Sequence, residues 1–221
     1  MLTTPAPSRL ALVTGASRGL GSALAELLST EYHIVAVART TGGLEELDDR
    51  IQARGGQATL APMDIAQDAA MQHLCRSIHD RWGGLDLWIH TAIHAAPLCP
   101  AGQSDAKDFD KSIATNATAT QRLITYVDPL LRGRSGGTAV FFDDPNAGGT
   151  AFHGVYGASK AAQMTLVRSW QAETHNLEPN VMVLTPPPMP TGLRARFHPG
   201  EDRAALTPIA DAAAAIRAQL P

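Results

Sequence analysis

The sequence is poor in cysteine and has no long hydrophobic run. Cys75 and Cys99 are its two cysteines, and they lie in unlike surroundings, so we expect reduced thiols rather than a disulfide. No Cys/His spacing matches a zinc site, and no metal is expected. No apolar stretch approaches the length that spans a bilayer, and residues 1–9 lack the apolar segment of a secretory signal. We therefore expect a cytoplasmic protein that does not enter a membrane.

Strong charge of either sign is also missing. The formal net charge is −3 at pH 7, and the lysines and arginines are scattered along the chain. Nothing therefore indicates a nucleic-acid surface. The 221 residues, 44% of them hydrophobic, suffice for one full core. We interpret residues 1–9 as a flexible N-terminal tail and residues 10–221 as a single domain.

Short apolar runs alternate with longer segments of helical periodicity. This alternation is typical of βαβ units and predicts an α/β fold, a single doubly wound Rossmann domain with about six parallel strands flanked by helices. The predicted strands are Leu10–Val13, Ile34–Ala38, Ala58–Ala61, Leu85–His90, Thr138–Phe142 and Val181–Leu184. The predicted helices are Gly19–Ser29, Gly43–Ala53, Ala66–Trp82, Asp105–Leu131, Val155–His175 and Thr207–Leu220.

A glycine-rich turn, TGASRGLG from Thr14 to Gly21, joins the first strand to the first helix. Gly15 permits backbone angles that a Cβ forbids, Gly19 allows a pyrophosphate to approach the backbone, and Gly21 lets the helix pack close to the strand. The free amide groups at the helix start, with the helix dipole, attract phosphate. The turn therefore predicts a dinucleotide site. Its contacts are expected from Gly15, Ser17, Arg18, Gly19, Leu20 and Gly21.

A second pattern, YGASK from Tyr156 to Lys160, places a phenol and an ammonium four residues apart on a predicted helix. A nearby positive charge favours phenolate and would lower the pKa of Tyr156 from its ordinary value of about 10. Tyr156 would then serve as an acid or base near neutral pH. Such pairs are common in helices, so the pattern gains its meaning from the glycine turn that accompanies it.

Together these motifs make residues from about 9 to 191 resemble the short-chain dehydrogenase/reductase family, of the classical type with a shortened C-terminus. The resemblance implies hydride transfer between a nicotinamide cofactor and a small carbonyl or alcohol substrate. Tyr156 would exchange the proton, and Lys160 would lower its pKa and bind the nicotinamide ribose. Asn116 matches the family's Asn, which lies in a distorted helix whose carbonyl holds a proton-relay water. By itself, an Asn such as Asn116 is more often a surface or capping residue.

The same resemblance implies further cofactor contacts. Asp64, after the third strand, matches the position that meets the adenine ring, and Thr191 matches the one that contacts the nicotinamide amide. Both residues could instead cap helices. His90 begins HTAI, where the family has Asn-Asn-Ala-Gly lining the cofactor ribose, and it can replace an Asn through its ring nitrogens. Ile93 cannot adopt glycine's special angles, so the loop there must run differently.

The end of the second strand decides which nicotinamide is expected. An acidic residue at this place binds the ribose 2′-hydroxyl, but here Ala38 is followed by Arg39. The guanidinium is suited to a phosphate, and Arg18 in the glycine turn could reach the same group. Both features indicate NADP, with NAD as the less favoured cofactor. The alternative is that both arginines are solvated surface charges.

One departure concerns the position thirteen residues before Tyr156, where the family places a Ser and this chain has Asp143, followed by Asp144. An ionised carboxylate cannot donate a hydrogen bond to a carbonyl and would raise the pKa of Tyr156. A protonated Asp143 could donate. A carboxylate also suits a substrate with N–H groups or a C=N bond, and pteridine reductases of this family have Asp at this distance from the Tyr. We expect Asp143 to face the substrate.

Three hypotheses follow. The first is an NADP-dependent carbonyl or alcohol oxidoreductase, and the second is a pterin-like C=N reductase that uses Asp143. The third is a non-catalytic nucleotide-binding sensor or partner-binding module, suggested by the missing Ser. A short substrate loop is expected at about 192–206. The resemblance also implies a homodimer or homotetramer formed through the helices at 105–131 and 155–175, whose apolar residues could equally face the chain's own sheet.

Overall fold

Six parallel strands form one sheet in the order β3-β2-β1-β4-β5-β6, in a computed structural model that describes residues 9–221. The core strands are apolar and buried along their whole length, as parallel strands covered on both faces must be. This confirms the predicted doubly wound sheet. The strands are β1 (Leu10–Thr14), β2 (His33–Ala38), β3 (Ala58–Pro62), β4 (Leu87–His90), β5 (Thr138–Phe142) and β6 (Asn180–Leu184).

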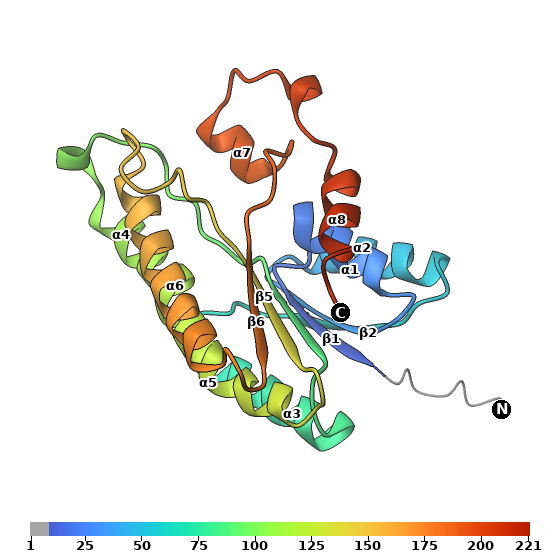
Figure 1. Ribbon diagram of the computed structural model, residues 1–221. Helices are drawn as coiled ribbons and strands as arrows, with labels where there is room; N and C mark the ends of the chain where they lie inside the picture. Colours follow the sequence, from blue (N-terminus) through green and yellow to red (C-terminus); the bar gives the residue numbers. More distant parts are fainter. Residues whose placement is uncertain (1–8) are drawn as a thin grey trace.

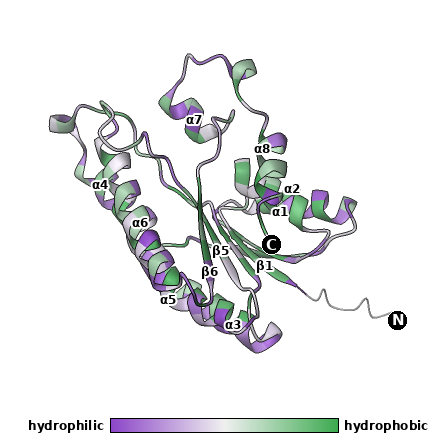
Figure 2. Ribbon diagram, in the orientation of Figure 1, coloured by the Kyte–Doolittle hydropathy of each residue, from purple (hydrophilic) through white to green (hydrophobic). Residues whose placement is uncertain are grey.

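Helices cover both faces of the sheet (Figure 1). On one face lie α3 (Asp68–Trp82), α5 (Ala119–Arg132) and α6 (Gly154–Glu173), whose apolar residues share one core cluster. On the other face lie α1 (Gly19–Leu28), α2 (Thr41–Ala53) and α8 (Ile209–Arg217), which share a second cluster. In Figure 2 the strands are mostly hydrophobic and the helices carry mixed surfaces, because each helix buries only one face.

The long helix predicted at 105–131 is wrong as a single regular helix. The structure divides it into α4 (Ala106–Ser112), a π-helical segment η2 (Ile113–Thr118) and α5. Asn116 lies inside the π-helical segment, where we expected a distortion. The Thr120 hydroxyl donates to the Asn116 carbonyl at 2.8 Å, a side-chain bond back to the preceding turn that competes with the regular ladder.

The segment predicted as a substrate loop contains a short helix, α7 (Gly192–Phe197), and a 3-10 turn, η3 (Arg203–Ala205). Figure 1 shows α7 standing beyond the carboxyl ends of the strands. The final helix is shorter than predicted. It begins at Ile209 because Pro208 takes its cap position, while the Thr207 amide donates to the Pro188 carbonyl across the loop.

Two further boundaries differ from the prediction. The fourth strand begins at Leu87, because the Leu85 amide donates to the Leu130 carbonyl outside the sheet. Arg9, predicted as the last tail residue, belongs to the folded part: its carbonyl accepts from the His33 amide, and its guanidinium lies 4.4 Å from the Tyr32 ring centroid. The rest of the predicted tail, residues 1–8, lies outside the described residues.

The strand order places a crevice between β1 and β4, where the chain reverses its direction across the sheet. Ligands of open parallel sheets bind at such a switch point, outside the carboxyl ends of the strands. Both cysteines are free, with Cys75 buried in the core. Within residues 9–221, none of the helices combines the length and apolar character needed to cross a bilayer.

Candidate functional site

A cleft of about 1040 Å³ opens at the carboxyl ends of the strands. It brings together residues from the first loop, the ends of β2, β4 and β5, helix α6 and the segment before α7. All but one of the predicted site residues line it: Gly15, Ser17, Arg18, Gly19, Leu20, Gly21, Arg39, Asp64, His90, Asp143, Tyr156, Lys160 and Thr191. The exception is Asn116, which is fully buried behind the cleft wall.

The glycine turn forms one wall of this cleft. Gly15 has φ 89°, and a Cβ there would lie 2.6 Å from the Ala92 backbone nitrogen. A Cβ on Gly21 would lie 2.5 Å from the Gly15 carbonyl oxygen. Helix α1 begins without a side-chain cap and without an acidic residue in its first turn, so its first amide groups remain available to an anion. The turn therefore fits the pyrophosphate of a dinucleotide.

Arg39 and Asp64 lie beside each other at the ends of β2 and β3. Their nearest charged atoms are 3.8 Å apart, and the Arg39 side chain is 52% exposed, which leaves the guanidinium free to meet a phosphate. The Asp64 carboxylate also accepts from the Ala66 amide at 2.9 Å in the loop before α3, whose cap position is Gln67, so Asp64 does not cap that helix. Both residues nevertheless line the cleft.

Thr191 faces the glycine turn across the cleft. A Cβ on Gly19 would lie 3.6 Å from the Thr191 methyl carbon. The Thr191 hydroxyl oxygen accepts from the Arg194 amide at 3.2 Å and caps the start of α7. The two interpretations of Thr191, as a turn cap and as a cofactor contact, are therefore compatible.

Tyr156 is buried at the base of the cleft, with the carboxylate of Asp144 near its hydroxyl. Burial raises the pKa of Tyr156, and the negative charges of Asp144 and Asp143 raise it further. Lys160 is not among the groups that shift the pKa of Tyr156, so the expected lowering is not found in the cofactor-free protein. The phenol is therefore held in its protonated form at neutral pH.

The Lys160 ammonium has two hydrogen-bond partners within the protein. It donates to the Phe142 carbonyl at the end of β5 and, at 2.8 Å, to the side-chain oxygen of Gln163. Burial lowers the pKa of Lys160 to about 8, while the carboxylates of Asp143 and Asp144 act in the opposite direction. An ammonium has three N–H donors, so one remains for a group in the cleft.

We expected Asp143 to face the substrate, but its carboxylate is bonded to other groups of the protein. One of its oxygens pairs with Arg168 of α6 at 2.5 Å, and the other accepts from the Asp144 amide at 2.8 Å. Both carboxylate oxygens of Asp143 are therefore engaged as acceptors by protein groups. The carboxylate that faces the reactive phenol is that of Asp144, which sequence reasoning noted only as its neighbour.

Asn116 joins the catalytic helix to the loop after β4. Its side-chain oxygen accepts from the His94 amide at 2.7 Å, and its side-chain nitrogen donates to the Ser159 hydroxyl at 2.9 Å. The Ser159 hydroxyl in turn donates to the Tyr156 carbonyl. Asn116 therefore holds the helix that carries Tyr156 and Lys160 rather than lining the cleft.

His90 reaches the cleft wall, but its ring is fully engaged inside the protein. One ring nitrogen lies 2.8 Å from the Thr14 hydroxyl and the other 3.3 Å from the Thr120 hydroxyl. Burial, with the charge of Lys160, lowers the pKa of His90 to about 3, so the ring is neutral. The ring nitrogens are thus occupied by protein groups and do not replace an Asn side chain toward a ribose.

Sequence reasoning missed four contributors: Thr120, Gln163, Phe197 and the Asp144 carboxylate. Phe197 of α7 packs on Tyr156 with ring centroids 4.8 Å apart and helps to bury it. The four-residue spacing of Leu193 and Phe197 was an available signal for a helix there. Gln163, a polar residue on the buried face of α6, was a second available signal.

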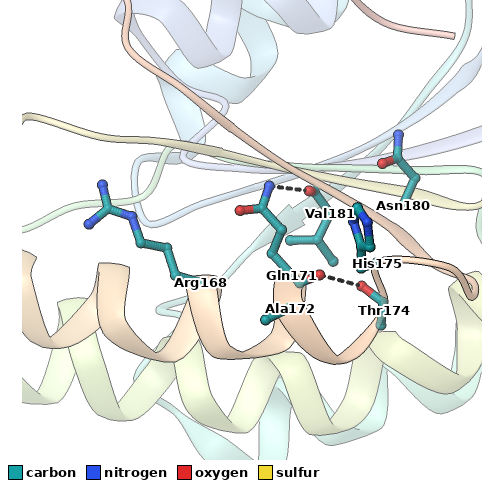
Figure 3. Close-up of a pocket in the computed structure, with 7 residues that line it drawn as sticks. All are labelled: Arg168, Gln171, Ala172, Thr174, His175, Asn180 and Val181. Carbon is teal, nitrogen blue, oxygen red and sulfur yellow. Dashed lines mark hydrogen bonds between the residues drawn. The ribbon is translucent and has the colours of Figure 1, made fainter.

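A second, smaller hollow lies between the C-terminal half of α6 and the edge strand β6 (Figure 3). Gln171 donates to the Val181 carbonyl at 2.7 Å across it, and the Thr174 hydroxyl bonds back to its own helix. None of the predicted site residues lines this hollow. The cleft at the carboxyl ends of the strands is therefore the candidate active site.

Known proteins resemble this chain in sequence. Residues 9–202 match the family model described as short chain dehydrogenase. Ketoacyl reductase HetN of Nostoc sp. is 29% identical over 185 residues, which cover 83% of this chain and 64% of HetN. The chain spans 62% and 57% of the lengths of two further curated relatives.

Solved structures resemble the whole fold. A short chain dehydrogenase from Pseudomonas syringae has a TM-score of 0.86 at 28% identity, covering 92% of this chain and 85% of that one. A short chain dehydrogenase from Shigella flexneri complexed with NADP has a TM-score of 0.85 at 26% identity, covering 93% and 88%.

Proposed function

Because this chain belongs to the short-chain dehydrogenase/reductase family, we propose that it is an NADP-dependent oxidoreductase acting on a small carbonyl or alcohol substrate. One observation carries the proposal: the glycine turn, Tyr156 and Lys160 open into the same cleft. A nicotinamide dinucleotide bound there supplies or accepts a hydride, while the protein contributes position and electric field. NADP bound to a structural relative supports the choice of cofactor.

Tyr156 is the group that moves the proton. Burial and the negative charge of Asp144 keep the hydroxyl protonated at neutral pH, which is the state required to donate a proton to a substrate oxygen. Lys160 contributes a positive charge at the base of the cleft and one free N–H donor. This state of the phenol favours reduction of a carbonyl over oxidation of an alcohol.

Replacing Tyr156 by Phe tests the mechanism. The ring and its packing on Phe197 are retained while the proton donor is removed, so we expect turnover to fall by at least about a hundredfold with little change in NADPH affinity. Tyr126→Phe is the matched control, since this tyrosine bonds to Asp68 away from the cleft. Unchanged turnover in Tyr156→Phe would rule out the proposed role.

Asp144 supports a second candidate function, the reduction of a C=N bond. An ionised carboxylate repels charge that develops on a carbonyl oxygen, but it accepts from the N–H of a protonated imine and stabilises its positive charge. Hydride would add to the imine carbon while the C=N π electrons move to nitrogen, which leaves a neutral amine. Asp144 would then have the role at a C=N bond that the sequence suggested for Asp143.

Asp144→Ser separates the two reactions, with Asp143→Ser as the matched control. If the protein reduces carbonyls, Asp144→Ser should raise the rate of carbonyl reduction, because a hydroxyl donor replaces a carboxylate. If the protein reduces imines, Asp144→Ser should instead lower the rate of imine reduction by about tenfold or more. Asp143→Ser should break the Arg168 pair without either change. NADPH binding without oxidation by any carbonyl or imine of a panel would favour the third hypothesis, a nucleotide-binding sensor.

A further inference from the structure

A chain of polar side chains lies buried beneath the base of the cleft, between β1, β4, α5 and α6. It consists of Thr14, His90, Thr120 and Gln163, of which none is more than 8% exposed, and it ends at Lys160. Buried polar groups cost free energy unless their hydrogen bonds are made. The donor and acceptor of each hydrogen bond between these side chains can therefore be assigned in turn.

The Thr120 hydroxyl carries one proton, and the shortest acceptor near it is the Asn116 carbonyl at 2.8 Å. Thr120 must then accept from its other partners, His90 at 3.3 Å and the Gln163 amide at 3.0 Å. His90 is thus protonated on Nε2 and accepts on Nδ1. The Thr14 hydroxyl supplies that Nδ1 bond at 2.8 Å and itself accepts from the Trp88 indole at 3.3 Å.

This assignment determines the orientation of Gln163. Its amide nitrogen donates to Thr120, so its side-chain oxygen is directed at Lys160. The reverse orientation would place N–H donors against an ammonium, which has no acceptor. The three side chains behind Gln163 therefore present an acceptor to Lys160 in a single geometry.

We propose that Gln163 is a positioning residue, which holds the Lys160 ammonium at the base of the cleft and is itself oriented by Thr120, His90 and Thr14. The proposal rests on the proposed function for the role of Lys160. Gln163 lines the cleft, and its side chain is hydrogen-bonded to Lys160 and Thr120, so it acts on the site through Lys160.

The charge of Lys160 shows why such a partner matters. The groups that face it are the Phe142 carbonyl, the carboxylates of Asp143 and Asp144 after β5, and the neutral ring of His90 on β4. Burial opposes the charged form, and Asp143 is shared with Arg168. A fixed acceptor at 2.8 Å keeps the ammonium charged in a site that ligands would dehydrate further.

The titration of Lys160 in the cofactor-free protein tests the proposal directly. The chain has three lysines, Lys107, Lys111 and Lys160, so the ε-carbon resonances of labelled lysine can be followed by NMR, and Lys160→Arg identifies the third. Gln163→Leu should lower the pKa of Lys160 by about one unit, because a hydrogen bond to the charged form is lost. Gln163→Glu should raise it, because a carboxylate replaces the amide.

Opposite shifts of the Lys160 pKa in Gln163→Leu and Gln163→Glu would exclude a general loosening of the structure, because loosening would shift the pKa in the same direction in both variants. Gln163→Met, unbranched and of similar length, replaces Gln163→Leu where that variant does not fold. Thr120→Val removes the group that orients Gln163 and should shift the Lys160 pKa downward, whereas Thr120→Ser keeps the hydroxyl and should restore it. An unchanged Lys160 titration in Gln163→Leu or Gln163→Met would overturn the proposal.

The alkaline limb of the pH–activity profile should shift together with the Lys160 pKa measured by NMR, because deprotonation of Lys160 removes its positive charge from the cleft. Substitution of Gln163 should change kcat at high pH more than the KM of the substrate. A failed Tyr156→Phe test would remove the proposed function, but the lysine titration needs no turnover. The two failures are therefore distinguishable.

Discussion

Asp143 and Asp144 are adjacent in sequence and differ completely in surroundings. Asp143 pairs with the guanidinium of Arg168, while Asp144 meets the hydroxyl of Tyr156. Both residues line the cleft, but the carboxylate of Asp143 is bonded to Arg168 and to the Asp144 amide, whereas the carboxylate of Asp144 lies near Tyr156. At this scale the chemistry depends on side-chain direction, which the spacing to Tyr156 does not specify.

Arg39 allows a test of cofactor choice. Arg39→Ala should raise the Kd for NADPH about tenfold and leave that for NADH nearly unchanged, because a charge-assisted bond to the extra phosphate is lost from an exposed side chain. Fluorescence titration with both nucleotides measures this difference. Arg54→Ala, at the end of α2 and paired with Glu26, is the control. Equal weakening of both nucleotides would contradict the assignment of NADP.

His90 should make the folding free energy depend on pH. Its pKa is about 3 in the folded protein, against an ordinary 6.5, because burial excludes the charged ring. The unfolded chain therefore binds a proton first as the pH falls, and stability is lost below about pH 6.5. Between about pH 6.5 and pH 4 the wild type should lose up to about 3 kcal/mol more than His90→Asn.

Denaturant unfolding of both proteins at several pH values measures this difference. Asn at position 90 also changes the buried hydrogen bonds, so its absolute stability is not the readout. The readout is the slope with pH, and parallel slopes for the two proteins would contradict a neutral, buried His90.

The site residues named from motifs differ in how well the sequence located them. The glycine turn was predictable because its backbone angles and close contacts require glycine at set positions. The positions of Tyr156 and Lys160 on one helix followed from their spacing, but the Lys160 partners did not. Gln163 and Thr120 belong to different helices, and only packing brings them within 3.0 Å.

At the scale of elements, the π-helical turn shows how a local irregularity serves the site. It places the Asn116 side chain between the loop after β4 and the helix α6. Apolar periodicity predicted one continuous helix there, because the period of a π turn differs too little from 3.6 residues to be seen over one turn.

Helix α7 was predicted as loop because it is short and lies among prolines and charged residues. It covers the cleft with Phe197, whose ring packs on Tyr156. Phe197→Ala should expose the phenol, lower its raised pKa toward the ordinary value and raise the KM of the substrate severalfold. Phenolate absorbance during a pH titration follows the first effect, and steady-state kinetics follow the second.

Phe109→Ala provides the comparison, since Phe109 is an exposed aromatic residue of α4. It should leave the Tyr156 titration unchanged. A Tyr156 titration that is identical in wild type and Phe197→Ala would show that α7 does not bury the phenol.

At the scale of the whole molecule, α6 has two faces. Met164, Val167 and Trp170 are buried against the chain's own sheet. These apolar residues are therefore not available for contact with a second subunit. Ala161, Thr165 and Arg168 are exposed on the other side of the helix. We propose that this face, with α5, forms a homodimer or homotetramer interface.

Ala161→Arg tests that assembly. A bulky charge at the centre of a closely packed face should convert the oligomer to a monomer, because the interface loses its complementarity and buries an unpaired charge. Light scattering coupled to size-exclusion chromatography reads the mass. Ala53→Arg, on the exposed side of α2, is the control. A wild-type protein that is already monomeric, or an unaffected oligomer, would contradict the proposal.

Patterns of neighbouring residues were sufficient to predict the alternation of strands and helices, the parallel sheet and the place of the nucleotide turn, because periodicity and glycine angles act over short stretches of the chain. Folding determines which groups surround Tyr156 and Lys160. Their partners Asp144 and Phe197 lie outside α6, and the pKa values of Tyr156 and Lys160 depend on burial and on charges that folding brings together. Those interactions fall off over a few ångströms in space, irrespective of distance along the chain.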